Sequence, residues 1–212
     1  MERKQTLFIL VIIFTSTILQ TESKSTNRTV PDRFIESACR ATRYHSLCVQ
    51  TLSAYGTNIR HNDQDLAVAA LTVSLARARV GSAFISKLVG TRALRPREMP
   101  GIGPRDYMAI KDCAQTMGDS VDRLAQSVKE LVRAGGSDSP EDFMWRMSNV
   151  QTWVSAALTD VSTCLDGFGG GRSTDGKVKG MVRNRVIHVA RVTSNALALV
   201  NRFADRRSVK IP

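Results

Sequence analysis

The sequence predicts an all-α protein, an up-and-down four-helix bundle preceded by a short N-terminal helical hairpin and held by two disulfides. Three observations support this prediction. Four long stretches repeat apolar residues at intervals of three or four, the period of a helix with one buried face. Aromatic residues make up only 6% of the 212 residues, so the core is mostly aliphatic, which suits helices better than a β-sandwich. The sequence also contains four cysteines, an even number that fits paired disulfides.

Residues 1–23 are predicted to be a secretory signal peptide rather than part of the fold. Arg3 and Lys4 precede an apolar run over Leu7–Leu19, which is too short to cross a bilayer comfortably and is followed by polar residues. No second apolar run of that kind follows, so the mature protein is expected to be secreted and not to enter a membrane. Asn27 opens an Asn-Arg-Thr sequon for N-glycosylation.

An N-terminal extension and helical hairpin are expected over residues 24–60. Cys39 and Cys48 are nine positions apart, which fits a disulfide across a small hairpin ahead of the bundle. In the chain-entropy account, closing so short a loop stabilises the fold by somewhat under about 3 kcal/mol.

The bundle is expected over residues 61–206, with a C-terminal tail over 207–212. Each helix has one apolar stripe, and glycines and prolines interrupt the chain between helices. Ser139 followed by Pro140 is a favourable helix start. Antiparallel neighbours can then bury the four stripes against one another. The helices are predicted over residues 63–89, 107–133, 141–165 and 177–203.

The other two cysteines, Cys113 and Cys164, test this antiparallel arrangement. Cys113 lies 24 residues before the middle of the turn at Ser137, and Cys164 lies 26 residues after Asp138. Positions equidistant from the turn face each other in an antiparallel pair, so Cys113–Cys164 is the second predicted disulfide. Zinc binding is a weaker alternative, because no two cysteines have C-x-x-C spacing and no histidine sits beside one.

The sequence contains no recognisable catalytic, metal-binding or cofactor-binding constellation. Three histidines lie in three different segments: His45, His61 and His188. None has the spacing of a metal site, so surface or partly packed histidines are expected. A Gly-Asp-Ser sequence ends at Ser120 inside a predicted helix, where no strained turn exposes a nucleophile. The loop Gly171–Lys177 has the spacing of a phosphate loop, but Val178 replaces the required Ser or Thr. We therefore predict a binding protein without a cofactor, not an enzyme.

The protein is strongly basic, with 30 Lys and Arg against 19 Asp and Glu and a net charge of +11. Outside the cell, such a charge attracts acidic polymers, acidic proteins or membrane surfaces. The basic residues are spread along the chain rather than gathered in one stripe, so an ordinary solvated surface is expected. Nucleic acid is not an expected partner, because no binding motif or aromatic platform accompanies the charge.

Three segments carry a family resemblance. They are Phe34–Tyr55 (FIESACRATRYHSLCVQTLSAY), Ala109–Cys113 (AIKDC) and Trp153–Phe168 (WVSAALTDVSTCLDGF). In this order they resemble the opening hairpin, the start of the second bundle helix and the most distinctive block of the plant invertase and pectin methylesterase inhibitor family. The likeness covers essentially the whole mature chain and includes all four cysteines. His45 departs from the family pattern, in which proline is common after the tyrosine.

The resemblance implies an inhibitor in the plant apoplast. In the implied mechanism, the bundle lies one-to-one across the substrate cleft of a pectin methylesterase and so modulates methylesterification of cell-wall pectin. The run that begins at Trp153 is similar to the pectin methylesterase branch, and the Pro-Lys-Phe feature of the invertase branch is absent. Two alternatives stay open. One is an inhibitor of acid invertase of the cell wall or vacuole; the other is a basic protein held on acidic pectin by charge, without inhibitory activity.

The resemblance also implies an enzyme-binding surface near the second disulfide. Asp119 and Asp122 are three positions apart and therefore share a helix face. Thr163 and Asp166 lie on the antiparallel neighbour. These four residues are expected to gather at one end of the bundle, as an acidic and hydroxyl patch suited to a basic enzyme.

Overall fold

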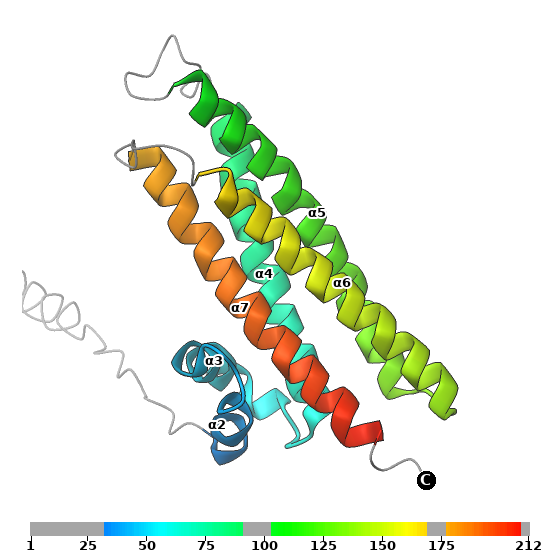
Figure 1. Cartoon of the computed structure of the whole chain (residues 1–212). Coiled ribbons are helices and arrows are strands. Elements are labelled where there is room, and N and C mark those ends of the chain that lie inside the picture. The colour runs from blue at the N-terminus through cyan, green and yellow to red at the C-terminus, as the bar shows by residue number, and fades with distance from the viewer. Residues whose placement is uncertain (1–31, 91–102, 169–176, 209–212) are drawn as a thin grey trace, which may run out of the picture. The chain divides into compact units, whose positions relative to one another are not determined.

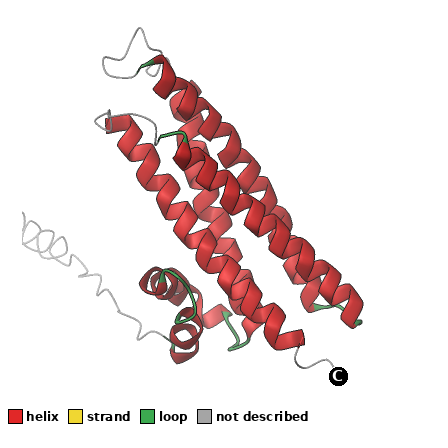
Figure 2. Ribbon diagram, viewed as in Figure 1, coloured by secondary structure: helices red, strands yellow, loops and turns green. Residues whose placement is uncertain are grey.

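The computed structural model describes residues 32–90, 103–168 and 177–208, which form α-helices, one short 3₁₀ helix and no strand (Figures 1 and 2). The elements are α2 (Arg33–Cys39), α3 (His45–Leu52), η1 (Ser53–Asn58), α4 (Asp63–Gly90), α5 (Pro104–Gly135), α6 (Pro140–Asp166) and α7 (Lys177–Ser208). The predicted all-α fold, with a helical hairpin ahead of four long helices, is confirmed. The predicted signal peptide, the sequon at Asn27 and the loop from Gly171 to Gly176 lie outside the described residues.

The four long helices form a closed ring in which each packs against its neighbours in the chain and α7 also packs against α4. As a result, α4 and α7 form one side of the bundle and α5 and α6 form the other. Two side-chain contacts show that α4 and α7 are antiparallel, because the earlier residue of α4 contacts the later residue of α7. The Ser74 and Thr193 hydroxyl oxygens lie 2.7 Å apart, and Arg202 Nε donates to Asp63 Oδ1 over 2.8 Å.

The core contains about one buried residue per helical turn from each long helix, mostly Val, Leu, Ile and Ala.

By length and composition alone, α4 is apolar enough to cross a membrane. Its buried residues, however, pack against α5 and α7, so its place in the core explains its composition. Gly81 lies where α4 packs closely against α5 and α7, because a Cβ there would lie 3.3 Å from Met117 Cε and 3.4 Å from Val189 Cγ2.

Both predicted disulfides are present. Cys39 and Cys48 join α2 to α3 with their Cα atoms 5.7 Å apart. Cys113 and Cys164 join α5 to α6 with a Cα–Cα distance of 4.5 Å. All four cysteines are buried, so the disulfides are part of the core as well as covalent links.

The hairpin is attached to the bundle by polar contacts from a buried side chain. Asn195 of α7 accepts a hydrogen bond from the Tyr44 backbone N–H over 3.0 Å and donates to the Tyr44 carbonyl over 2.9 Å. His61 lies in the left-handed backbone region, with φ of 52°, and its Nε2 is 2.7 Å from Oδ2 of Asp32. Asp32 also caps α2 by accepting from the Phe34 N–H. The start of the hairpin is therefore tied to the segment that leads into α4.

Helix ends account for most differences from the predicted bounds. α5 begins at Pro104, three residues early, since proline at a first helical position loses no useful N–H. α6 begins at Pro140, where Ser139 Oγ accepts from the Asp142 N–H over 3.1 Å. α7 continues to Ser208, so the start of the predicted tail is helical.

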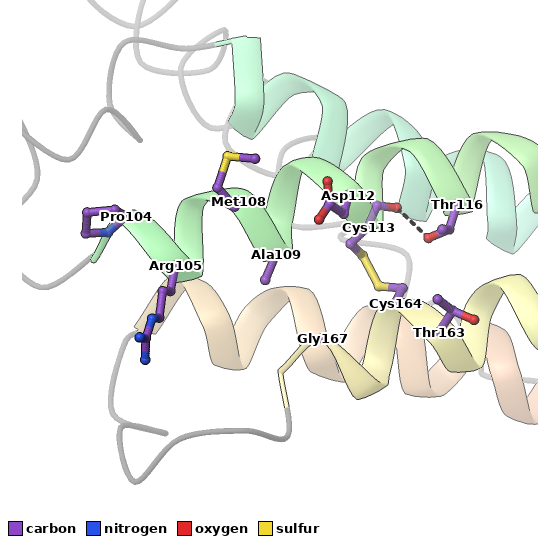
Figure 3. A pocket seen from close by; sticks show the side chains of 10 residues that line it. All are labelled: Pro104, Arg105, Met108, Ala109, Asp112, Cys113, Thr116, Thr163, Cys164 and Gly167. Atoms are coloured by element: carbon purple, nitrogen blue, oxygen red, sulfur yellow. Dashed lines mark hydrogen bonds between the residues drawn. A yellow bond between two sulfur atoms is a disulfide. The ribbon is translucent and has the colours of Figure 1, made fainter.

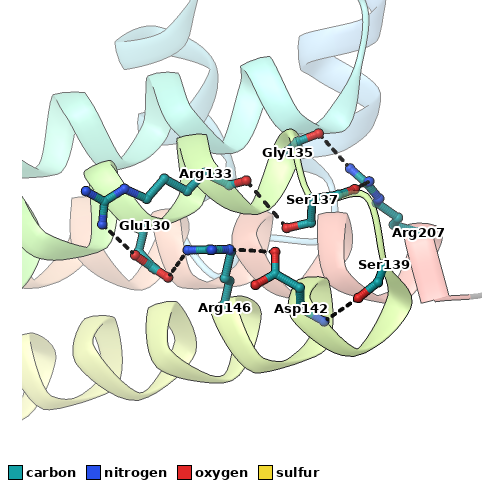
Figure 4. A network of polar contacts seen from close by, with 8 residues as sticks. All are labelled: Glu130, Arg133, Gly135, Ser137, Ser139, Asp142, Arg146 and Arg207. Carbon is teal, nitrogen blue, oxygen red and sulfur yellow. Dashed lines mark hydrogen bonds and ion pairs between the residues drawn. The ribbon is translucent and has the colours of Figure 1, made fainter.

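Polar contacts close the end of the bundle where α5 turns into α6 (Figure 4). Arg207 donates to the carbonyls of Gly135 and Ser137 over 3.0 and 3.2 Å, and so pairs one carbonyl at the end of α5 and one in the turn that follows it. The buried carboxylate of Glu130 pairs with Arg146 at 2.9 Å and with Arg133 at 3.3 Å. This end of the bundle is therefore held by charge-assisted hydrogen bonds, while the opposite end of the α5–α6 pair is held by a disulfide.

Candidate functional site

A pocket of about 650 Å³ lies where α5 begins and α6 ends (Figure 3). The Cys113–Cys164 disulfide forms part of its wall. Two small residues also line it: a Cβ added to Gly167 would lie 3.8 Å from the Ala109 Cβ, so α5 and α6 can approach closely here. Beyond the small residues and the disulfide, its lining includes Met108, Asp112, Thr116 and Thr163.

Two threonines, one from α5 and one from α6, line this pocket. Thr163 is exposed and donates to the Thr159 carbonyl over 3.0 Å. Thr116 is half-buried and donates to the Cys113 carbonyl over 3.3 Å. Each hydroxyl therefore uses its proton within its own helix and keeps acceptor capacity for a donor from outside. The exposed carboxylate of Asp112 adds a negative charge to the same pocket.

The four predicted partner-binding residues do not gather at one end of the bundle. Thr163 lines the pocket, and Asp166 is the last residue of α6. Asp119 and Asp122 are exposed midway along α5, because six and nine residues beyond Cys113 correspond to about 9 and 14 Å of helix. The expectation of one compact patch is therefore wrong: Thr163 and Asp166 lie near the end of α6, and Asp119 and Asp122 lie midway along α5.

Asp119 takes part in a charge cluster with Arg123 and Asp160. Arg123 Nε lies 2.8 Å from Asp160 Oδ2 and joins α5 to α6. The Asp160 side chain is only 18% exposed, and this burial raises the pKa of its carboxyl; Arg123 opposes the rise, and the nearby charge of Asp119 adds to it. The cluster places two carboxylates and one arginine on the same face as the pocket.

Four residues of this face were missed by the sequence prediction: Asp112, Thr116, Arg123 and Asp160. A signal for three of them was available, because the α5 positions 112, 116, 119 and 123 are separated by four, three and four residues and so form one stripe. Asp160 lies three positions before Thr163 and follows the same rule on α6. We call the surface formed by these residues with Asp119 and Thr163 the α5–α6 face.

The structure shows where the serine and histidines lie for which the sequence predicted no catalytic or metal-binding role. Ser120 is fully buried inside α5, so its Gly-Asp-Ser sequence presents no nucleophile. His61 pairs with Asp32, and His188 lies between α4 and α7 near two arginines. Across the ranges that the structure describes, no group of His, Cys, Asp or Glu is arranged to hold a metal ion. The described residues form a disulfide-stapled helical bundle with a helical hairpin ahead of it.

Comparison with known proteins gives the family. A family model described as plant invertase/pectin methylesterase inhibitor matches residues 33–199, and the chain belongs to this family. The chain is 60% identical to Pectinesterase inhibitor 9 of Arabidopsis thaliana with both chains fully covered. It is 48% identical to the 21 kDa protein of Daucus carota, covering 82% of this chain and 86% of that one.

A solved structure agrees with the fold. The crystal structure of mutant form A of a pectin methylesterase inhibitor from Arabidopsis matches with a TM-score of 0.59 and 22% identity, over 79% of this chain and 95% of that chain. At this identity the match supports the fold alone. The family resemblance seen in the three sequence segments is confirmed, as is the prediction of an enzyme inhibitor rather than an enzyme.

Proposed function

We propose that this protein is a secreted inhibitor of pectin methylesterase that acts in the plant cell wall. The observation that carries the proposal is the 60% identity, over the whole of both chains, to a relative named a pectinesterase inhibitor. An apoplastic location follows from the predicted signal peptide and from the fact that pectin, the substrate of such an esterase, is a wall polymer. Two buried disulfides are consistent with an oxidising compartment.

The inhibitor is proposed to bind one esterase molecule through the α5–α6 face and to block access of pectin to the substrate cleft. No covalent step is needed. A rigid surface favours this mechanism, because a preorganised binder loses little conformational entropy on association. The Cys113–Cys164 disulfide and the Arg123–Asp160 pair supply that rigidity by joining α5 to α6 at two levels.

The chemistry of the face fits a partner that presents basic groups. On the face itself, Asp112 and Asp119 are exposed carboxylates, and Thr116 and Thr163 offer hydroxyl acceptors; Asp122 and Asp166 are further exposed carboxylates on the same two helices. Lysines and arginines of an esterase could donate to both kinds of group. Asp119, Asp122, Thr163 and Asp166 therefore stay in the proposal as partner-binding residues, now joined by Asp112 and Thr116.

A titration of two enzymes tests this proposal. The oxidised protein, with both disulfides verified, would be added at nanomolar to micromolar concentration to a plant pectin methylesterase and to an acid invertase. We expect esterase activity to fall to completion near one equivalent of inhibitor, with invertase unaffected. Loss of invertase activity alone would move the target to the second enzyme. If neither enzyme responded, the protein would be better explained as a basic wall protein held by charge.

A further inference from the structure

Opposite charges are separated onto the two sides of the bundle. α7 carries eight basic residues and one acidic residue, Asp205, whereas α6 carries four acidic residues and one basic residue, Arg146. In α4 no acidic residue follows Asp65. Because α4 packs against α7 and α5 packs against α6, most of the excess positive charge lies on the side away from the α5–α6 face. Basic residues that are scattered in the sequence are thus gathered in space.

Four arginines form the centre of this positive surface: Arg43, Arg77, Arg185 and Arg191. We call them the cationic face. All four are exposed, and within the described part of the chain none of them pairs with a carboxylate. By contrast, Arg123, Arg146 and Arg202 each have an acidic partner. The cationic face is therefore charged without internal compensation.

Aromatic rings hold three of these guanidinium groups in place. Arg185 lies 4.1 Å from the centre of the Phe84 ring, so a residue of α7 covers a residue of α4. Arg43 and Arg191 lie 5.6 and 5.5 Å from the Tyr44 ring, which joins the hairpin to α7. A cation over a ring is attracted to its π-electrons and keeps its N–H donors free for another acceptor. These arginines are thus partly ordered before any ligand arrives.

The pKa of His188 is affected by two arginines of the cationic face. His188 lies between these arginines on α7, and burial lowers the pKa of its imidazole, with the charges of Arg77 and Arg191 lowering it further. The charges of Arg77 on α4 and Arg191 on α7 therefore both act on the His188 imidazole and favour its neutral form. Such an arrangement is unfavourable alone and becomes favourable when an anion with several charges lies across it.

We propose that the cationic face binds a linear polysaccharide rich in carboxylate groups, such as de-esterified pectin. Guanidinium groups pair with carboxylates through two parallel hydrogen bonds, and several spaced arginines suit a polymer that repeats its charge. Nucleic acid is less favoured, because Phe84 and Tyr44 are covered by arginines and offer no free ring for base stacking. A membrane surface is less favoured because the apolar stripes of α4 and α7 are buried in the bundle.

This surface lies on the opposite side of the bundle from the α5–α6 face. If the proposed function holds, one inhibitor molecule can contact the polymer and the esterase at the same time. The polymer would then concentrate the inhibitor where its target works. The polysaccharide proposal itself needs only the cationic face, so the two proposals can fail separately.

Binding to polygalacturonate provides the test, measured by calorimetry on the oxidised protein at several salt concentrations. The test variant is Arg77→Gln/Arg185→Gln/Arg191→Gln. The matched control is Arg60→Gln/Arg133→Gln/Arg206→Gln, which removes the same charge from exposed arginines that already pair with carboxylates. We expect the test variant to lose at least tenfold in affinity and to show a weaker salt dependence, while the control loses less than threefold. Fully methyl-esterified polymer should not bind.

Three results would overturn the proposal. Equal losses in both variants would mean that net charge alone drives binding. If the parent protein did not bind polygalacturonate at low salt, the cationic face would not be a polysaccharide-binding site. Equal or tighter binding to single-stranded DNA or to vesicles with phosphatidylserine would assign the face to another polyanion. Circular dichroism confirms that each variant is folded, and esterase inhibition by the test variant, expected to be unchanged, reports on the proposed function independently.

Discussion

Arg123 of α5 donates from its Nε atom to Oδ2 of Asp160 of α6 over 2.8 Å, across the face that carries the candidate binding residues. Arg123 is 43% exposed and Asp160 is 18% exposed, so the arginine reaches from solvent to a mostly covered carboxylate. The pair therefore fixes the register of α5 against α6 on the surface and prevents Asp160 from being left as a covered, unpaired charge.

Replacing Arg123 with alanine should make stability depend more strongly on pH. The pKa of Asp160 is already raised in the folded protein, and Arg123 works against that rise. When folding raises the pKa of a carboxyl, that group contributes fully to folding stability below its pKa in the unfolded chain, near 3.8. This contribution is lost as the pH rises through its pKa in the folded protein. Arg123→Ala should therefore cost about 1 kcal/mol at neutral pH and less at pH 3. Urea unfolding at several pH values measures this, and a loss independent of pH would contradict it.

Asn195 should control attachment of the hairpin to the bundle. Its amide makes two hydrogen bonds to the Tyr44 backbone, and the side chain is only 4% exposed. Asn195→Ala leaves the half-buried Tyr44 N–H unpaired and leaves the Tyr44 carbonyl with the Cys48 N–H as its donor, so we expect a loss of about 2 kcal/mol and faster amide exchange in residues 33–52. The exposed Asn184→Ala is the control and should change neither. Unchanged exchange in the hairpin of the Asn195 variant would show that other contacts hold it.

Two buried serines should respond in opposite directions to substitution by alanine. Ser120 Oγ is buried without a hydrogen-bond partner among the described residues. Ser74 Oγ is equally buried but lies 2.7 Å from Thr193 Oγ1. Ser120→Ala should be neutral or stabilise by up to about 1 kcal/mol, whereas Ser74→Ala should destabilise by about 1 kcal/mol. Thermal unfolding compares them, and a greater loss at Ser120 would contradict this account of its hydroxyl.

The two disulfides should contribute unequally to stability. The Cys113–Cys164 bond spans 51 positions, and the Cys39–Cys48 bond spans 9. In the chain-entropy account, Cys113→Ala/Cys164→Ala should cost about 4 kcal/mol and Cys39→Ala/Cys48→Ala somewhat under 3 kcal/mol. Denaturant unfolding of both double variants gives the comparison. If the short loop proved the more important, local packing of the hairpin would outweigh loop entropy.

The helices and disulfide pairing could be predicted from the sequence because both depend on local rules. Apolar spacing marks the buried stripes, and counting from the turn at Ser137 places Cys113 opposite Cys164. The layout of the candidate site could not be predicted in the same way. Asp119 and Cys113 are near in sequence, yet the rise of the helix separates them by about 9 Å. Nor does the sequence show that Arg77 of α4 and Arg191 of α7 act on the same histidine, since this depends on how the ring of helices closes.

The most direct test of the proposed inhibitory surface replaces one threonine on each side of the bundle. Thr163 and Thr72 are both exposed, and each hydroxyl donates to the carbonyl four positions earlier, over 3.0 and 2.8 Å. The substitutions Thr163→Arg and Thr72→Arg therefore make the same chemical change on α6 and on α4. The inhibition constant of each variant against a plant pectin methylesterase would be compared with that of the parent protein. We predict that Thr163→Arg weakens inhibition at least tenfold while Thr72→Arg leaves it within twofold. Equal inhibition by both variants, or a greater loss at Thr72, would contradict binding through the α5–α6 face.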